Sequence, residues 1–372
     1  LPEVPLLGVL PGTGGLTRVT DKKKVRHDLA DLFCTSVEGV RGQKAKDWRL
    51  VDDIAKPAAF AARVQERALQ LAADSQRPAS AQGVTLPPLT RQIEADALRY
   101  DFVEVEIDRA RRCATFMVKS PAAAPPTDMA GIEAAGAAWY PLQMGRELED
   151  AILEMRTNEP EIGTWLIKTQ GDRGTVQAMD ASLVAHSAHW LVRETIGLLR
   201  RTFSRLDLSS RSLFALIEPG SCFSGTLLEL ALACDRSYQL ALPDDEAQAP
   251  RIDVGETNFG FYPMVTGQSR LQRRFYDEPA PIAAVRVAVG HALDADAAFA
   301  LGLITRNPDD IDWADEIRIA IEERVAMSPD ALTGMEANLR FNGPENMFTR
   351  VFGRLTAWQN WIFQRPNAVG EK

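Results

Sequence analysis

The chain has 372 residues, of which 45% are hydrophobic and 25% are charged, the balance of an ordinary globular protein. This composition excludes a collagen-like or largely disordered chain, and the length predicts two or three structural units. The net charge of −9 argues against a broad surface for nucleic acid, so no nucleic-acid partner is expected.

The N-terminal part of the chain, residues 1–75, is predicted to be the C-terminal part of a first module. It opens with an apolar, glycine-rich segment and turns helical from Lys22 onward, with Ala and Leu at helical spacing over 58–73. Residues 76–95 are rich in Ser, Pro and Gln and have little periodicity, which predicts a linker. A second domain is therefore expected over 96–372.

The second domain is predicted to begin with a β-hairpin. The segment FVEVEID (102–108) alternates apolar and polar residues, and CATFMV (113–118) follows after a polar turn. An amphipathic helix is expected over 144–156, and the apolar run TWLIKT that follows it is predicted to be a buried strand.

Further strands and helices are expected to alternate beyond residue 180. A long helix is predicted over 181–203, then the strand FALI (214–217) and an almost wholly apolar, buried helix, GTLLELALACD (225–235). Strands that alternate with helices indicate an α/β core. No apolar run reaches the roughly 18 residues that a membrane-spanning helix needs, so no membrane span is expected.

Four residues near the N-terminus recur with identical spacing about 252 residues later. Gly8, Pro11, Gly15 and Arg18 correspond in this way to the set Gly260, Pro263, Gly267 and Arg270. The offset is that of a domain, so we predict two tandem copies of one module. Because the sequence opens in the middle of this motif at Leu1, we expect the first copy to be truncated.

The Gly/Ser-rich turn before the apolar helix is the first candidate for chemistry. Backbone N–H groups at a helix start near Thr226 are unpaired and lie at the positive end of the helix dipole, where they suit a developing oxyanion. Glu229 falls in the first turn of this helix, where burial would raise its pKa and make it a general acid or base. Alternatively, Thr226 and Glu229 fit the capping box, in which the glutamate only caps its own helix.

A second candidate is Glu256, which follows a glycine and precedes an aromatic loop, with a helix start expected near Thr266. Two carboxylates at one pocket make an acid/base pair that activates and delivers water. The alternative is that Glu256 is a surface loop residue. Spacing leaves open whether Glu229 and Glu256 meet.

The four cysteines indicate the cellular compartment and whether a metal site is expected. Cys34, Cys113, Cys222 and Cys234 do not make a disulfide framework in so long a chain, and no CxxC pair supports structural zinc. No metal site is therefore predicted. A reducing, cytoplasmic location is the simplest interpretation.

Two motifs resemble the crotonase (enoyl-CoA hydratase/isomerase) superfamily. SGTLLELALACD (224–235) resembles the family helix GGG-x-E-L-A-x-x-C-D, and GETNFGFYPMVTGQSR (255–270) resembles P-E-x-x-x-G-x-x-P-x-x-G-G-x-x-R, as does the segment that opens the chain. The resemblance covers about residues 1–55 and 165–305. It implies an α/β fold with a crotonase-like (ββα) spiral core and a C-terminal helical region, in two tandem modules of which the first is truncated.

The resemblance also implies site residues. The two family glutamates fall on Glu229 and Glu256, and Glu3 occupies the matching place in the first copy, one position off register. The two oxyanion N–H groups fall on Thr226 and near Gln177, which precedes Asp180, a match to a family aspartate.

Two glycines complete the implied substrate-binding set, Gly225 before the helix and Gly260 in the later motif. By resemblance the substrate is a CoA thioester, and no cofactor is required beyond the CoA that the substrate carries. A homo-oligomer is expected. The expected function is that of a lyase or hydrolase of a CoA thioester. Two alternatives stay open: a generic enoyl-CoA hydratase or isomerase, and a non-catalytic second module that supports a site in the first.

Overall fold

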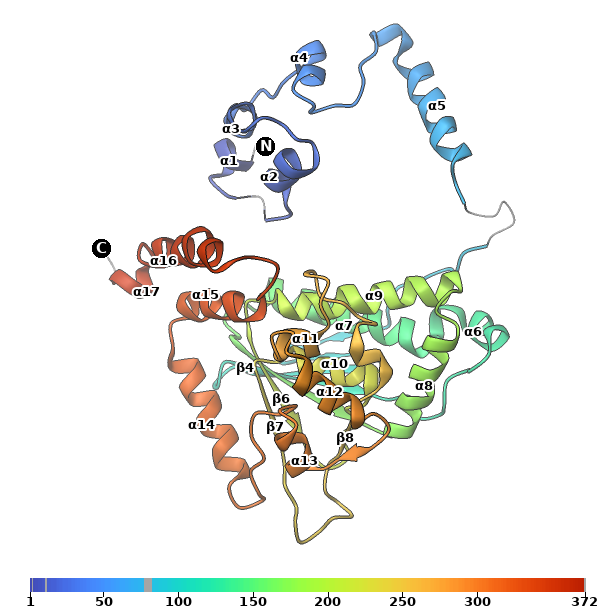
Figure 1. Cartoon of the computed structure of the whole chain (residues 1–372), viewed down its shortest axis with the longest axis vertical. Coiled ribbons are helices and arrows are strands. Elements are labelled where there is room, and N and C mark those ends of the chain that lie inside the picture. Colours follow the sequence, from blue (N-terminus) through green and yellow to red (C-terminus); the bar gives the residue numbers. More distant parts are fainter. Residues whose placement is uncertain (2, 11, 77–81, 371–372) are drawn as a thin grey trace. The chain divides into compact units, whose positions relative to one another are not determined.

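The computed structural model describes residues 1, 3–10, 12–76 and 82–370, which form two units, Leu1–Gly83 and Val84–Lys372 (Figure 1). The boundary lies inside the segment predicted as a linker, 76–95. The last residues of that segment belong to the second unit, because strand β1 (Gln92–Ile93) is hydrogen-bonded to its sheet. Pro11, one member of the predicted repeat, lies outside the described residues.

The first unit is helical in its described residues. Its buried residues are small in number and size, namely Val25, Ala30, Cys34 and Ala45. Its helical segments are α1 (Glu3–Leu7), α2 (Gly15–Thr17), η1 (Arg18–Lys22), α3 (His27–Thr35), α4 (Gly42–Asp47) and α5 (Pro57–Ala73). The helical pattern expected over 58–73 is confirmed by α5, although none of its residues is buried within the unit.

The second unit is built on a seven-stranded sheet in which neighbouring strands follow chain order. The first four strands pair antiparallel and the last four pair parallel. The predicted hairpin is confirmed, since Val103 pairs with Val118 and Asp108 with Cys113. After β1, the strands are β2 (Ala97–Arg99), β3 (Val103–Asp108), β4 (Cys113–Lys119), β5 (Thr164–Gln170), β6 (Ser212–Ile217) and β7 (Arg236–Gln239).

Both faces of this sheet are covered, which explains why β6 is apolar at nearly every position. Leu213, Ala215 and Ile217 point into the larger core, whereas Phe214 and Leu216 pack in a smaller cluster with residues of α14 (Trp313–Ala326). Side chains alternate between the two faces of a strand, so a continuous apolar run serves both layers.

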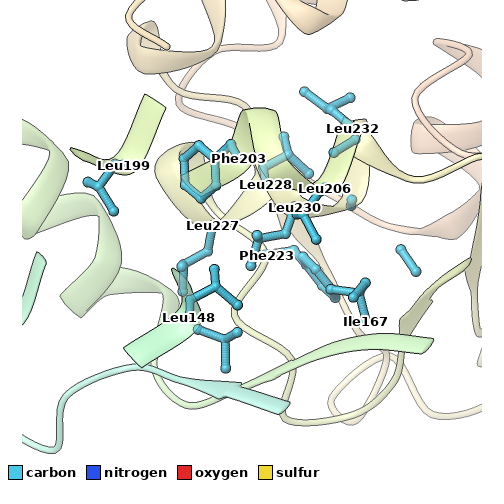
Figure 2. Close-up of a cluster of buried hydrophobic side chains, with 14 of the residues drawn as sticks. Leu148, Ile167, Leu199, Phe203, Leu206, Phe223, Leu227, Leu228, Leu230 and Leu232 are labelled. Carbon is cyan, nitrogen blue, oxygen red and sulfur yellow. The ribbon is translucent and has the colours of Figure 1, made fainter. Parts of the chain in front are cut away.

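The larger core is organised around α10 (Gly225–Ala233), whose nine residues are all buried. Figure 2 shows four leucines of this helix, Leu227, Leu228, Leu230 and Leu232, packed among side chains of the neighbouring elements. Those neighbours include α7 (Tyr140–Asn158) and α9 (Trp190–Asp207). The prediction of a wholly buried helix here is confirmed.

Shorter elements complete the second unit. Helices α6 (Met129–Ala135) and η2 (Gly136–Ala138) precede α7, and α8 (Arg173–Ala185) follows β5. After β7 come β8 (Ile252–Asp253), η3 (Glu256–Phe259), α11 (Arg270–Arg274), α12 (Pro279–Val287), β9 (Ala292–Leu293) and α13 (Ala295–Ala300). Beyond α14 lie α15 (Pro329–Arg340), η4 (Thr349–Leu355), α16 (Thr356–Ile362) and α17 (Pro366–Val369).

The single long helix predicted over 181–203 is wrong, because α8 ends at Ala185 and α9 begins at Trp190. The break is held by local contacts. The N–H of His186 bonds back to the carbonyls of Ser182 and Val184, and its imidazole Nε2 lies 2.9 Å from the Thr127 carbonyl oxygen. Both helices bury one face, so hydrophobic periodicity continues across the turn and hides it.

No helix of the described residues is both long enough and apolar enough to cross a bilayer.

Candidate functional site

A cavity of about 500 Å³ lies where the start of α10 meets α8 and the segment from β8 to η3. Three of the residues predicted for the site line it, namely Gln177, Gly225 and Glu256. Its other lining residues are Asp180, Ala181, Val184, Ala185, Ser224, Asp253, Val254, Gly255, Thr257, Val289 and Gly290.

The carboxyl of Asp180 lies in the cavity wall and is 8% exposed. The Thr226 N–H donates to its Oδ2 at 2.8 Å, and the Thr257 hydroxyl donates to the same oxygen at 3.1 Å. The Thr226 hydroxyl donates to Oδ1 and also lies 2.9 Å from the hydroxyl of Tyr262. Asp180 therefore accepts three hydrogen bonds, two of them from the start of α10.

Burial raises the pKa of Asp180 to about 7, because desolvation of the carboxylate outweighs the hydrogen bonds from Thr226 and Thr257 that oppose it. The negative charge of Glu229 adds to the rise. A carboxyl group that titrates near neutral pH beside a cavity is suited to proton transfer.

Gly225 is required by the position of this carboxyl. Its φ is +41°, and a β-carbon at this position would lie 1.7 Å from Asp180 Oδ2. No side chain fits there without displacing Asp180, so the absence of a side chain lets helix and carboxyl approach.

The two backbone donors expected for a substrate oxygen are both engaged. The Thr226 N–H bonds to Asp180 rather than facing an empty position. Gln177 is the fifth residue of α8, beyond the four N–H groups that a helix leaves unpaired, so its side chain and not its N–H is available to the cavity. The oxyanion roles of both residues remain predictions.

Glu229 does not line the cavity and does not cap its helix. The capping-box alternative is wrong, because α10 begins one residue before Thr226, at Gly225, after the N-cap residue Ser224, with no side-chain capping bond. Instead the carboxylate, 2% exposed, accepts from Asn258 Nδ2 at 2.8 Å and from Arg270 Nη1 at 3.0 Å.

Arg270 completes a buried charge cluster, since its Nη2 donates to Asp207 Oδ2 at 2.8 Å. One guanidinium thus serves two carboxylates. Burial raises the pKa of Glu229, and the charge of Asp207 raises it further, while Arg270 and Asn258 oppose the rise. This arrangement ties α9, α10 and α11 together.

Glu256 also lines the cavity, but unlike Glu229 and Asp180 it is exposed to solvent. It is the first residue of η3, its side chain is 63% exposed, and its Oε2 accepts from Arg286 Nη1 at 3.0 Å. The Arg286 guanidinium also stacks 3.7 Å from the ring centroid of Phe259. The two predicted glutamates therefore do not share a pocket. The acidic residues that line the cavity with Glu256 are Asp180 and Asp253, and Asp253 already accepts from Arg173 Nη1 at 2.9 and 2.8 Å.

The two remaining predicted residues lie elsewhere. Gly260 caps η3 with φ +111°, a left-handed conformation that favours glycine, and it does not line the cavity. Glu3 starts α1 in the first unit, where its Oε2 is buried without a hydrogen-bond partner among the described residues. The role of Glu3 remains a prediction.

The helix start expected near Thr266 lies four residues later. Helix α11 begins at Arg270 after the N-cap Ser269, whose hydroxyl accepts from the Gln272 N–H in a capping box. The pairing of Arg270 with Glu229 and Asp207 was not predicted, because the sequence shows Arg270 only as the last residue of a motif.

The burial of Asp180 could have been predicted from the pattern of apolar residues around it. Val176, Met179, Asp180 and Leu183 recur at helical spacing and are all buried on α8. A lone acid on an apolar helix face predicts a buried carboxyl, and such a group needs partners. Nothing local identifies those partners, because Thr226 and Thr257 are 46 and 77 residues away.

The described residues were expected to hold no metal site and no disulfide framework. No group of three or more His, Cys, Asp or Glu side chains there is arranged to hold a metal ion. The four cysteines are free and buried, and burial raises the pKa of the Cys222 thiol.

Comparison with known proteins gives one close curated relative. Benzoyl-CoA-dihydrodiol lyase of Aromatoleum evansii is 59% identical over 372 residues, which is 100% of this chain and 66% of the relative. The chain thus spans just under two thirds of that protein's length. No family model matches the chain.

Solved structures show the fold. An enoyl-CoA hydratase from Geobacillus kaustophilus HTA426 has a TM-score of 0.51 and 15% identity, covering 73% of this chain and 92% of its own. An enoyl-CoA hydratase of Mycobacterium smegmatis has a TM-score of 0.51 and 15% identity, covering 72% of this chain and 93% of its own. An enoyl-CoA hydratase/carnitine racemase of Magnetospirillum magneticum has a TM-score of 0.51 and 17% identity, and the match covers 73% of this chain and 91% of that protein. The predicted crotonase-like α/β fold is confirmed.

Proposed function

Because the chain has the crotonase-like fold, we propose that it belongs to the enoyl-CoA hydratase/isomerase (crotonase) superfamily and acts in cofactor-independent cleavage of a ring carried on a CoA thioester. The observation that carries this proposal is the 59% identity to benzoyl-CoA-dihydrodiol lyase, which extends over all 372 residues. The substrate is 2,3-epoxybenzoyl-CoA or its dihydrodiol. Water opens and cleaves the ring, giving 3,4-didehydroadipyl-CoA semialdehyde and formate, a step in aerobic benzoate degradation.

The cavity at α10 is the proposed place for the acyl group in this chain. It is lined largely by apolar atoms and small residues, with three acidic residues, of which Asp253 is already bound by Arg173 and the other two, Asp180 and Glu256, differ in character. Asp180 titrates near neutral pH and is suited to exchange a proton, whereas the exposed Glu256 is suited to hold water. Ionisable groups whose surroundings differ in this way divide acid and base roles between them.

The test is product analysis with 2,3-epoxybenzoyl-CoA, using the Aromatoleum evansii lyase as the positive reference. Formate release by this chain, at a rate that depends on its concentration, is the expected result. A hydrated CoA thioester without formate would instead identify a simple enoyl-CoA hydratase, since hydration releases no formate.

A second candidate function is that this module supports an active site formed by the first module. Two observations favour it: Glu229 is held by Arg270, and the Thr226 N–H is held by Asp180. Neither group is then available to a substrate in the way that the family resemblance implies.

Glu256→Gln separates the two candidates, because Glu256 is exposed and the substitution leaves the fold intact. A loss of formate release of about a hundredfold places a general acid or base in this cavity. Unchanged turnover in this variant and in Asp180→Asn would assign the chemistry to the other module and this chain to a supporting role.

The proposed setting follows the same resemblance. We place the protein in the cytoplasm, consistent with four free cysteines, and as a homo-oligomer that needs no metal or redox cofactor. Static light scattering of the purified chain gives the number of subunits directly, and a mass of 41.0 kDa would exclude the oligomer.

A further inference from the structure

A second cavity of about 410 Å³ lies at the C-terminal end of α10, away from the candidate site at its N-terminal end. Its walls come from the segment that leaves α10, from α11, and from α14 and α15. Five arginines line it, namely Arg236, Arg273, Arg274, Arg324 and Arg340.

Of the residues that the structure describes, two acidic ones line this cavity, Asp235 and Glu336, and both are already bound. Asp235 accepts from Arg340 Nε at 2.9 Å and from its Nη2 at 2.6 Å, and it also accepts the Leu213 N–H. Glu336 accepts from Arg324 Nη1 at 3.1 Å. The two carboxylates therefore compensate Arg340 and Arg324.

The other three arginines have no carboxylate partner among the described residues. Arg273 and Arg274 donate only to backbone carbonyls, of Leu232 at 2.9 Å and of Gly302 at 2.5 Å. Arg236 lies over the ring of Phe214, with its guanidinium carbon 5.5 Å from the centroid. Five positive charges and two negative charges leave an excess of three in one cavity.

This excess of positive charge is costly because part of it is buried away from solvent. Burial lowers the pKa of both Arg273 and Arg274, and the neighbouring charge of Arg273 contributes to a value of about 10 for Arg274. Both groups remain protonated at neutral pH. The Nε atoms of Arg273 and Arg324 are buried without an acceptor in the part of the chain that the structure describes. Buried donors of this kind are ordinarily satisfied, so both N–H groups are available to an acceptor that enters the cavity.

We propose that this cavity binds a phosphate group, with Arg236, Arg273 and Arg274 as its principal ligands. Guanidinium groups donate in a planar fork that matches phosphate oxygens, and a dianion would offset most of the uncompensated charge. The phosphate comes either from a free anion or from a nucleotide. The site is separated from the candidate acyl cavity by the length of α10, about 13 Å for nine residues. It does not depend on the proposed function.

The test is calorimetric titration of the chain at low ionic strength with inorganic pyrophosphate and, separately, with 3′-phosphoadenosine 5′-diphosphate. Saturable binding is expected, weakened about tenfold or more in Arg273→Gln and in Arg236→Gln, since each removes a charged hydrogen-bond donor. The matched control is Arg193→Gln on the exposed face of α9, which lowers the net charge equally and should bind as the native chain does.

Arg236→Gln decides the result if Arg273→Gln fails to fold, because the only contact of the Arg236 guanidinium within the described residues is with the Phe214 ring. Binding of both probes identifies phosphate itself as the ligand, and binding of the nucleotide alone identifies a nucleotide phosphate. Absence of saturable binding, or equal binding by Arg236→Gln and the native chain, overturns the proposal.

Discussion

At the scale of single residues, Asp180 meets two opposing demands. Its carboxyl accepts three hydrogen bonds, which favour the charged form, yet it is buried deeply enough that the neutral form persists to about pH 7. Because its pKa is about 7 in the folded chain and 3.8 as the ordinary value, the folded chain binds the proton more tightly than the unfolded chain does.

This difference predicts how stability depends on pH. The free energy of unfolding should fall as pH rises from about 4 to about 7, by at most about 4 kcal/mol from this residue. Asp180→Asn cannot titrate, so its stability curve from denaturant unfolding between pH 5 and 8 should be flatter than that of the native chain. Asp245→Asn in an exposed loop is the control and should follow the native curve. A curve for Asp180→Asn parallel to the native one would contradict the prediction.

Glu229 provides a second prediction at this scale. Glu229→Gln removes one carboxylate from a buried guanidinium, and breaking a buried pair in this way costs about 3 kcal/mol of unfolding free energy. The same substitution at Glu256 breaks an exposed pair and should cost about 1 kcal/mol or less. Urea unfolding of the two variants at pH 7 checks the contrast. Equal losses would show that Glu229 contributes no more than a surface ion pair.

At the scale of elements, the start of α10 depends on Gly225. Gly225→Ala places a methyl group against Asp180 Oδ2 in a left-handed backbone conformation, so it should cost at least about 2 kcal/mol of unfolding free energy. Gly197→Ala is the matched control, because Gly197 lies inside α9 with nothing within 4 Å of the added carbon, and it should gain up to about 1 kcal/mol. Thermal and chemical unfolding of the two variants measure the predicted loss of stability in Gly225→Ala and the predicted gain in Gly197→Ala. A neutral Gly225→Ala would show that Asp180 moves away without loss.

The elements differ in how well sequence predicts them, for physical reasons. The hairpin of β3 and β4 and the buried helix α10 follow from local patterns, alternation in one case and an unbroken apolar run in the other. The turn at 186–189 does not, because it interrupts the chain without interrupting the periodicity of buried residues on α8 and α9.

The same distinction applies to the site. Gly225 and Glu256 were predicted by motif, and both line the cavity. That Asp180 lines the cavity and Glu229 does not was not predictable, because it depends on where the side chains of Arg270 and Thr257 arrive from distant elements. The motif identifies which carboxylates are present, whereas the packing of distant elements determines which of them is paired with an arginine.

At the scale of the whole molecule, the two units differ in their cores. Every residue of the two hydrophobic clusters of the second unit lies between Val84 and Val325, so this core is complete without the first unit. A chain of residues 84–372 should therefore fold alone and unfold in one cooperative transition. Its thermal midpoint should lie within about 3 °C of that of the main transition of the full chain, the shift that about 1 kcal/mol would cause. Calorimetry of both chains checks this, and a non-cooperative transition in the shorter chain would contradict it.

The bond between the Thr226 N–H and Asp180 has a consequence for ligand binding. A ligand oxygen that reaches this N–H must displace the aspartate, and the displaced carboxyl enters an apolar cavity where its neutral form is favoured. Ligand binding at α10 is then accompanied by proton uptake near pH 7. The measured heat of binding would vary with the ionisation enthalpy of the buffer, and affinity would increase toward acidic pH.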